Sequence, residues 1–274
     1  MIRGLVCAVS ATAILSAASC SGNSASSSSS SSASITAVGS TALLPLVKQA
    51  ATDYQTKHPD AKISVSGGGS MTGVTQAAQK GADIGDSDVL PVHEPSLVDH
   101  QVAVVAFALA VNPAARVKNL SSAQIRGIFS GKIKNWKAVG GADQPITIIN
   151  RPKSSGTRAV FVSKIMQGAQ PTDAGLTQDS SGTVAAMVAQ TGGAVSYLAA
   201  GYVKPGEQVA VSIDGVPPTD ANVESGKYAL WSYEYMLTNG QPSAQIADFI
   251  NFVKEDKPLL ARLHFIAVGD MKLK

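Results

Sequence analysis

Cysteine is nearly absent from this chain of 274 residues, and the two that occur, Cys7 and Cys20, lie within the first 20 positions. Disulfide frameworks and cysteine-based metal or redox sites are therefore excluded for the rest of the sequence. The four histidines occur singly and without the spacing of metal ligands. We accordingly expect neither a metal site nor a cofactor.

Charge is also scarce, since Asp, Glu, Lys and Arg make up only 15% of the residues and the net charge is +3. A balance so close to neutral, with the basic residues scattered, gives no indication of a nucleic-acid partner. Hydrophobic residues reach 45%, which fits a compact protein with a substantial core. After residue 20, however, no apolar run approaches the roughly 20 residues that span a bilayer. The length allows two domains or one large one.

The N-terminal segment carries targeting information. Arg3 is followed by an apolar run from residue 5 to 15 and by small residues up to Cys20, which predicts a signal peptide over residues 1–20. Residues 21–34 are nearly all Ser, a composition that cannot bury a core and predicts a flexible tether.

The residues before Cys20 resemble the lipobox of bacterial lipoproteins, although Ala17 stands where that motif usually has Leu. The resemblance implies acylation of Cys20 and anchoring to the outside of the cell membrane, or a periplasmic location if Cys20 is not acylated. Cys7 is lost with the signal peptide, so the mature chain would then hold no free thiol.

Beyond the tether, strand-like and helix-like segments alternate, which favours an α/β fold with mainly parallel sheets. We expect strands at 35–38, 63–66, 102–111, 146–149 and 194–198, extended aromatic segments at 228–231 and 233–236, and helices beginning near 43, 70, 121, 157, 183 and 243. Segments near 108–113 and 227–234 are candidates for crossings between two lobes.

Three loops share one arrangement, in which small polar residues lie between a strand and a helix. They contain Ser40-Thr41-Ala42, Gly67-Gly68-Gly69-Ser70 and Ser155-Gly156-Thr157. A helix N-terminus presents unpaired amides and the positive end of the helix dipole, which together hold an oxyanion. Each loop alone is equally well explained as an ordinary helix cap, but three that converge would form one electropositive pocket.

Arg151 precedes the third loop by four residues and supplies a planar cation that matches phosphate geometry. A short buried strand then ends in the acidic turn Asp86-Ser87-Asp88. A carboxylate fits an anion site only if the ligand carries a proton, because a carboxylate only accepts hydrogen bonds. This favours protonated phosphate over sulfate, while the alternative reading is that both Asp residues simply form a turn.

The ordered combination of 39–46, 67–70, 83–88, 128–136 and 150–158 resembles the phosphate-binding proteins of the bacterial phosphate-specific ABC importer. The resemblance covers residues 35–270 and implies a two-lobe periplasmic-binding-protein-like (type II) fold with a two-strand hinge. It implies phosphate binding by the following residues: Ser40, Thr41, Ala42, Ser70, Asp88, Arg151, Ser155, Gly156 and Thr157. Asp86 stands where the family pattern has an uncharged residue, and the sequence leaves open whether its side chain points outward.

The same resemblance places residues 35–110 and 229–274 in lobe one and residues 111–228 in lobe two. It implies a monomer that delivers inorganic phosphate to the permease and ATPase subunits of the importer. Three alternatives stay open: a receptor for sulfate or molybdate, a phosphate sensor or scavenger without a permease, and a phosphate-ester hydrolase. No Gly-x-Ser-x-Gly elbow supports the last of these.

Overall fold

The computed structural model describes residues 34–273. The signal peptide, Cys20 and the tether up to residue 33 lie outside the described residues, so the expectations for them stay predictions. Ser34, which we expected to end the tether, is instead the first residue of strand β1.

Strands and helices alternate along the described chain, as the sequence indicated. The first part comprises β1 (Ser34–Gly39), α1 (Leu44–Lys57), β2 (Lys62–Gly67), α2 (Ser70–Ala78), β3 (Ile84–Ser87) and β4 (Leu97–Val111). The middle part comprises η1 (Pro113–Ala115), β5 (Asn119–Leu120), α3 (Ser122–Phe129), η2 (Trp136–Val139), β6 (Thr147–Asn150), α4 (Gly156–Lys164), β7 (Leu176–Thr177), α5 (Ser181–Gln190), β8 (Ala194–Ala199), η3 (Ala200–Tyr202), β9 (Val209–Ile213) and α6 (Asp220–Glu224). The last part comprises β10 (Trp231–Asn239), α7 (Ala244–Glu255), α8 (Lys257–Arg262), β11 (Phe265–Ile266) and η4 (Val268–Asp270).

Helix starts follow from local chemistry. Pro45 lies in the first turn of α1, where its missing N–H is not needed. Ser121 and Gln124 form a capping box at α3, in which each side chain accepts a backbone N–H of the other residue. Ser243 caps α7 by accepting the N–H of Ile246.

The strands form a two-lobe sheet system with the order β2-β1-β3-β10-β4-β8-β6-β7. The outer strands are parallel as expected, since β1 pairs with β2 and β3, and β6 pairs with β7 and β8. Every pairing of β4 is antiparallel. For β10 the reason is that it brings the chain back beside β4 and so runs in the opposite direction.

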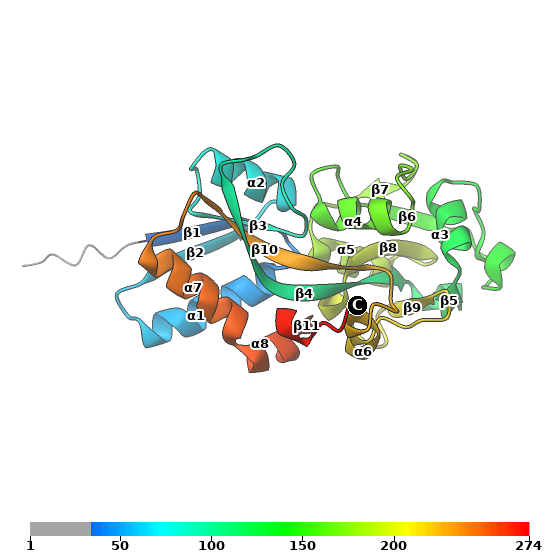
Figure 1. Ribbon diagram of the computed structural model, residues 1–274. Helices are drawn as coiled ribbons and strands as arrows, with labels where there is room; N and C mark the ends of the chain where they lie inside the picture. Colours follow the sequence, from blue (N-terminus) through cyan, green and yellow to red (C-terminus); the bar gives the residue numbers. More distant parts are fainter. Residues whose placement is uncertain (1–33, 274) are drawn as a thin grey trace, which may run out of the picture. The chain divides into compact units, whose positions relative to one another are not determined.

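β4 exchanges one partner strand for another near residue 107, close to the two segments that the sequence marked as candidate crossings, and the crossings themselves stay predictions. Trp231 is in register with Ala106, and from Phe107 onward β4 pairs with β8 instead of β10. Figure 1 shows α2 on one side of the first sheet and α1, α7 and α8 on the other, with α4 over β8 in the second lobe.

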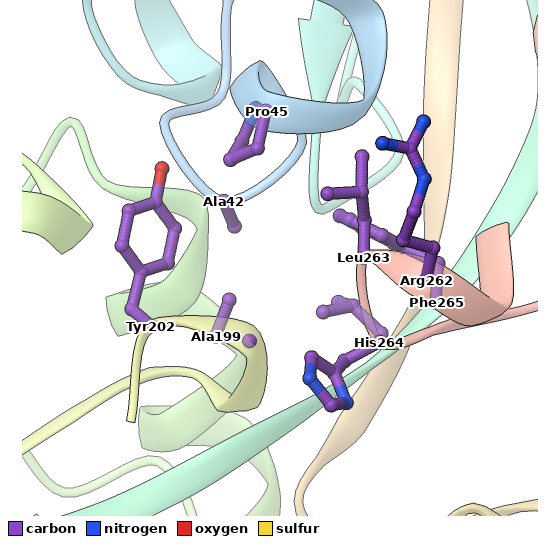
Figure 2. A pocket seen from close by; sticks show the side chains of 10 residues that line it. Ala42, Pro45, Ala199, Tyr202, Arg262, Leu263, His264 and Phe265 are labelled. Carbon is purple, nitrogen blue, oxygen red and sulfur yellow. The ribbon is translucent and has the colours of Figure 1, made fainter. Parts of the chain in front are cut away.

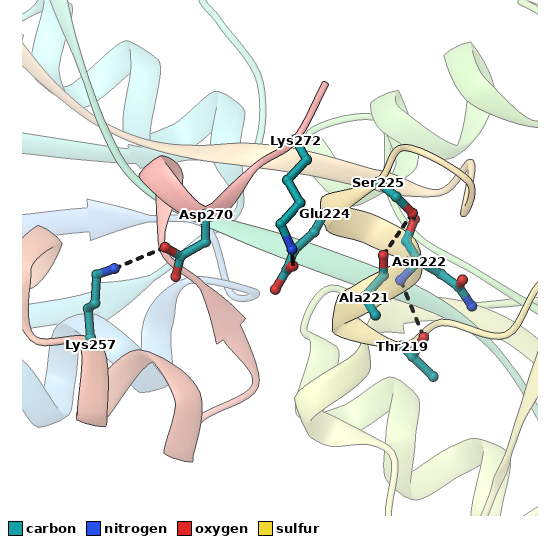
Figure 3. A network of polar contacts seen from close by, with 8 residues as sticks. All are labelled: Thr219, Ala221, Asn222, Glu224, Ser225, Lys257, Asp270 and Lys272. Carbon is teal, nitrogen blue, oxygen red and sulfur yellow. Dashed lines mark hydrogen bonds and ion pairs between the residues drawn. The ribbon is translucent and has the colours of Figure 1, made fainter. Parts of the chain in front are cut away.

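The C-terminal segment makes a third link. It follows β11 of the first sheet and ends against α6 of the second lobe, where the N–H of Lys272 donates to the Glu224 carbonyl at 2.7 Å. Lys272 Nζ also lies 2.6 Å from Glu224 Oε2, and Lys257 Nζ lies 2.9 Å from Asp270 Oδ1 (Figure 3). These pairs fasten the end of the chain on both sides of the crossing.

Aromatic packing fixes the helix that carries the third loop. The rings of Phe161, in α4, and Tyr197, in β8, stack with centroids 4.0 Å apart. Phe129, at the end of α3, meets Phe161 edge-on at 4.7 Å. Such pairs add about 0.5–1.5 kcal/mol to the stabilisation that burial of their surface provides, so α4 is held firmly at its position.

None of the helices within residues 34–273 has the length and apolar character needed to cross a bilayer.

Candidate anion-binding site

The loop after β1 begins with a turn that only glycine allows. Gly39 has φ of 147°, and a Cβ there would lie 2.9 Å from the backbone N of Asp86. Ser40 Oγ then accepts the N–H groups of Ala42, at 3.0 Å, and Leu43, at 3.2 Å. The hydroxyl of Ser40 thus shapes the loop, and the backbone of Thr41 is presented beside it.

The second loop brings Ser70, the first residue of α2, into the same region. Ser70 is fully buried, and its Oγ accepts the N–H of Asp88 at 3.0 Å. The neighbouring N–H of Met71 donates to the carbonyl of Ser154 at 3.1 Å. The start of α2 in lobe one therefore contacts the loop that leads into α4 in lobe two.

The third loop caps α4 and approaches from the other lobe. Ser155 Oγ accepts the N–H of Arg158 at 3.2 Å. At Gly156 the approach is so close that a Cβ would overlap Ser70 Oγ and lie 2.9 Å from Asp88 Cβ. Glycine is thus required here by contact between the lobes.

Asp88 forms hydrogen bonds with a residue of each of the three loops. It is 1% exposed, and its Oδ1 accepts a hydrogen bond from Ser40 Oγ. Its Oδ2 accepts one from Thr157 Oγ1 at 2.7 Å. One carboxylate therefore joins hydroxyl groups of lobe one and lobe two.

Arg151 lies in the same buried region with 1% of its surface exposed. Its Nη2 donates to Thr41 Oγ1 at 3.1 Å and to the Asp179 carbonyl at 3.0 Å. Its Nε has no hydrogen-bond partner among the described residues. Burial lowers the pKa of Arg151, and Asp88 is the largest of the charges that oppose this shift. A buried guanidinium with a free donor is suited to an anionic ligand.

The N-terminus of α5, a helix that the sequence predicted near residue 183 but did not assign to the site, also reaches it. The N–H of Ser181 donates to Thr41 Oγ1 at 3.2 Å, and Arg151 Nη1 lies 3.4 Å from Ser181 Oγ. A signal was present, because residues 180–183 repeat the Ser-Ser-Gly-Thr of residues 154–157. Tyr202, also missed, donates its hydroxyl to the Thr41 carbonyl at 2.8 Å.

Two further acids are buried beside Asp88. Asp86 and Glu234 are both 0% exposed, and none of their carboxyl oxygens has a hydrogen-bond partner among the described residues. Burial, and then the charge of Asp88, raises the pKa of Asp86 to about 8. Burial likewise raises the pKa of Glu234 far above its usual range. Asp86 therefore points inward, the direction that the sequence left open.

A small cavity of about 220 Å³ adjoins the first loop. Figure 2 shows Ala42 and Pro45 on one side, Tyr202 on another and the segment from Arg262 to Phe265 opposite. The side chain of Ala42 thus faces this cavity, whereas its backbone N–H donates to Ser40 Oγ.

Among residues 34–273, no group of three or more His, Cys, Asp or Glu residues is placed to hold a metal ion.

Comparison with known proteins places this site in a family. The model of the PBP superfamily domain matches residues 24–257. The phosphate-binding protein PstS of Bacillus subtilis is 44% identical over 247 residues, which are 87% of this chain and 82% of that protein. The chain belongs to the PstS family of phosphate-binding proteins. The PstS protein of Borreliella burgdorferi is 24% identical over 78% of this chain and 82% of its own length.

Solved structures agree with the PstS assignment. A phosphate ABC transporter substrate-binding protein with bound phosphate from Clostridium perfringens superposes with a TM-score of 0.82, at 30% identity, over 86% of this chain and 100% of that chain. An ABC-type phosphate transport receptor from Vibrio cholerae gives a TM-score of 0.70 at 29% identity, over 85% of this chain and 99% of its own. The two-lobe periplasmic-binding-protein-like fold expected from the sequence is thereby confirmed.

The buried Asp86 makes a prediction about stability. An unfolded chain loses the Asp86 proton near pH 4, whereas the folded chain keeps it up to about pH 8. The folded state therefore binds more protons in this window, and stability falls as the pH rises through it. We expect Asp86→Asn to flatten this fall and to raise the Tm at pH 7.5.

The measurement is thermal unfolding between pH 4.5 and pH 8.5, with Asp83→Asn as the matched control. Asp83 lies three residues earlier in the same segment, but it is exposed and bound to Thr36. An identical pH slope for the wild type and Asp86→Asn would show that Asp86 is ionised in the folded protein.

Proposed function

We propose that this protein is an extracytoplasmic receptor that captures inorganic phosphate between its two lobes and delivers it to the permease of an ABC importer. The observation that carries the proposal is the convergence of Arg151, three predicted loops and Asp88 in one buried region. The relatives named as phosphate-binding proteins, and the Clostridium perfringens structure with bound phosphate, support the choice of ligand.

Donors from both lobes would surround the anion. Thr41 and Ser70 would contribute from lobe one, together with Ser40 and Ala42 of the first loop. From lobe two the donors would be Arg151 and the Ser155-Gly156-Thr157 turn at the start of α4. Each hydrogen bond to a charged group contributes about 1.5–3 kcal/mol, so neither lobe alone would hold phosphate tightly. Closure of the two lobes would then depend on the ligand.

Asp88 would give the site its selectivity. Both hydrogen phosphate ions carry a P–OH group that can donate to the carboxylate, whereas sulfate at neutral pH carries no proton. Facing sulfate, the buried carboxylate would meet a second acceptor with no proton between the two, and the two negative charges would repel each other.

The remaining expectations form part of the same proposal. Residues 35–110 and 229–274 would form lobe one and residues 111–228 lobe two, with the C-terminal segment bound to lobe two at Glu224. We propose a monomer that is tethered by residues 21–34 and anchored through acylated Cys20. We also propose that it has no enzymatic activity, since within the described part of the chain no histidine hydrogen-bonds to the hydroxyls of Ser40 or Thr157, which both donate to Asp88.

Calorimetric titration with phosphate and then sulfate tests the ligand and its selection. We expect the wild type to bind phosphate without added metal and to bind sulfate at least 100-fold more weakly, a gap of about 2.7 kcal/mol. Asp88→Asn should weaken phosphate binding and reduce the difference between the affinities for phosphate and sulfate, because the amide can donate a hydrogen bond to either anion. Equal loss for both anions would refute the role of Asp88 as a proton acceptor, and tight sulfate binding by the wild type would favour a sulfate receptor.

Arg151 allows charge and geometry to be separated. We expect Arg151→Ala to lower phosphate affinity at least tenfold, or about 1.4 kcal/mol, because the buried fork and its free Nε are lost. Arg151→Lys keeps the charge but not the paired donors, so its affinity should lie between those of the wild type and the Ala variant. Affinity that is unchanged in both variants would place the ligand elsewhere.

Gly156 tests whether the lobes close on the ligand. An added Cβ would collide with Ser70 and Asp88 of the other lobe. Gly156→Ala should therefore hold the lobes apart and lower the phosphate affinity about tenfold, since overpacking costs roughly 1–3 kcal/mol. Gly182→Ala is the matched control, because a Cβ at this position of α5 would meet Tyr202 at an ordinary 3.7 Å. Equal affinities in the two variants would contradict the contact between the lobes.

A further inference from the structure

Three buried carboxyl groups lie near the place where β3 meets β10, close enough for their charges to influence one another. The strands are antiparallel, with Met236 opposite Asp86 and Tyr235 opposite Ser87. Glu234 precedes Tyr235 in β10 and Asp88 follows Ser87 at the end of β3, so both acids lie at the end of this pairing. All three acids are at most 1% exposed. We refer to Asp86, Asp88 and Glu234 as the carboxyl cluster.

Only one member of the cluster has donors. Asp88 accepts the hydroxyls of Ser40 and Thr157, whereas all four carboxyl oxygens of Asp86 and Glu234 lack a partner among the described residues. A buried carboxylate without a donor or a cation is strongly unfavourable, and such a group keeps its proton instead.

Among residues 34–273, no basic side chain forms a hydrogen bond with the carboxyl group of Asp86. On β1 and α2 its backbone meets glycines, Gly39 and Gly73. The charged groups that act on the cluster are its own members and Arg151, which interacts with Asp88. Arg151 is not among the groups that shift the pKa of Asp86. The cation thus stabilises the charge of Asp88 and leaves Asp86 without one.

Glu234 is the third acid of the cluster. Burial, and then the charges of Asp88 and Asp86, raises its pKa well above the usual range. Neighbouring buried carboxylates repel each other, which favours the protonated form of those that lack donors. Asp88, which accepts two hydroxyl hydrogen bonds, is therefore the member that holds the charge.

We propose that the carboxyl cluster carries a single negative charge, on Asp88, while the protein binds phosphate, and that ionisation of Asp86 in alkaline solution weakens the bound anion. Asp86 then sets the upper pH limit of phosphate capture. This inference rests on the proposed function. A second buried negative charge next to Asp88 repels a phosphate dianion in a region where water screens little.

Calorimetric titration with inorganic phosphate at half-unit steps from pH 6.5 to pH 9.5 tests the proposal. With Asp86 ionising near pH 8, the wild-type affinity should fall by about tenfold or more between pH 7 and pH 9.5, since a protonation requirement weakens binding up to tenfold per pH unit above the pKa. Asp86→Asn should stay level to within about threefold. Monohydrogen phosphate keeps its proton over this range, so titration of the ligand affects both proteins alike.

Asp83→Asn, which removes an exposed carboxyl from the same segment, is the matched control and should follow the wild type. Parallel profiles for the wild type and Asp86→Asn would overturn the inference and leave the proposed function intact. Absence of phosphate binding by the wild type at pH 7 would overturn both.

An infrared measurement keeps the proposal falsifiable if Asp86→Asn fails to fold. The wild-type protein should show absorption from protonated carboxyl groups at pH 7, part of which disappears by pH 9.5 while the fold persists. A spectrum without protonated carboxyl groups at pH 7 would overturn the inference.

Discussion

The structure depends on one carboxylate that both halves of the molecule hold. Asp88 accepts hydroxyl hydrogen bonds from Ser40 on one side and Thr157 on the other. These two bonds require that β3 end beside the first loop and that α4 begin opposite it. The glycines at 39 and 156 allow the close approaches that this demands. Much of the surrounding architecture can be understood as support for this arrangement.

Cationic side chains are few at the site, as they are in the chain as a whole. Arg151 is the only cation hydrogen-bonded to the first loop among the described residues, and the helix N-termini of α2, α4 and α5 add oriented amides around it. Fixed dipoles need less solvation than side-chain charges, which suits a region that is almost completely buried. Rigid packing matters for the same reason, because the stack of Phe161 on Tyr197 keeps α4 and its amides in position.

Sequence reasoning succeeded where local chemistry decides. The three loops, Arg151 and Asp88 were found from residue types and order, and the structure gathers them in one region, whereas their roles toward phosphate stay predictions. Glu234 was missed because it lies in an aromatic strand, and only the pairing of β10 with β3 brings it to Asp88. The sequence left open where the Asp86 side chain points because all four residues of β3 are buried. Both faces of this strand are covered, so polar and apolar residues do not alternate along it as they do in a strand with one solvent-exposed face. The antiparallel pairings of β4 likewise follow from the path of the chain between lobes, which no local pattern encodes.

The link between Lys272 and Glu224 bears on how the two halves move. In β4 and β10 the polypeptide itself connects the two lobes. This third link, in contrast, consists of a backbone hydrogen bond and an ion pair at the surface (Figure 3). Exposed ion pairs are weak and are screened by salt. The contact between Lys272 and Glu224 would therefore resist small movements of the two lobes relative to each other. A larger opening of the lobes would break this contact, and would do so more readily at high ionic strength than at low ionic strength.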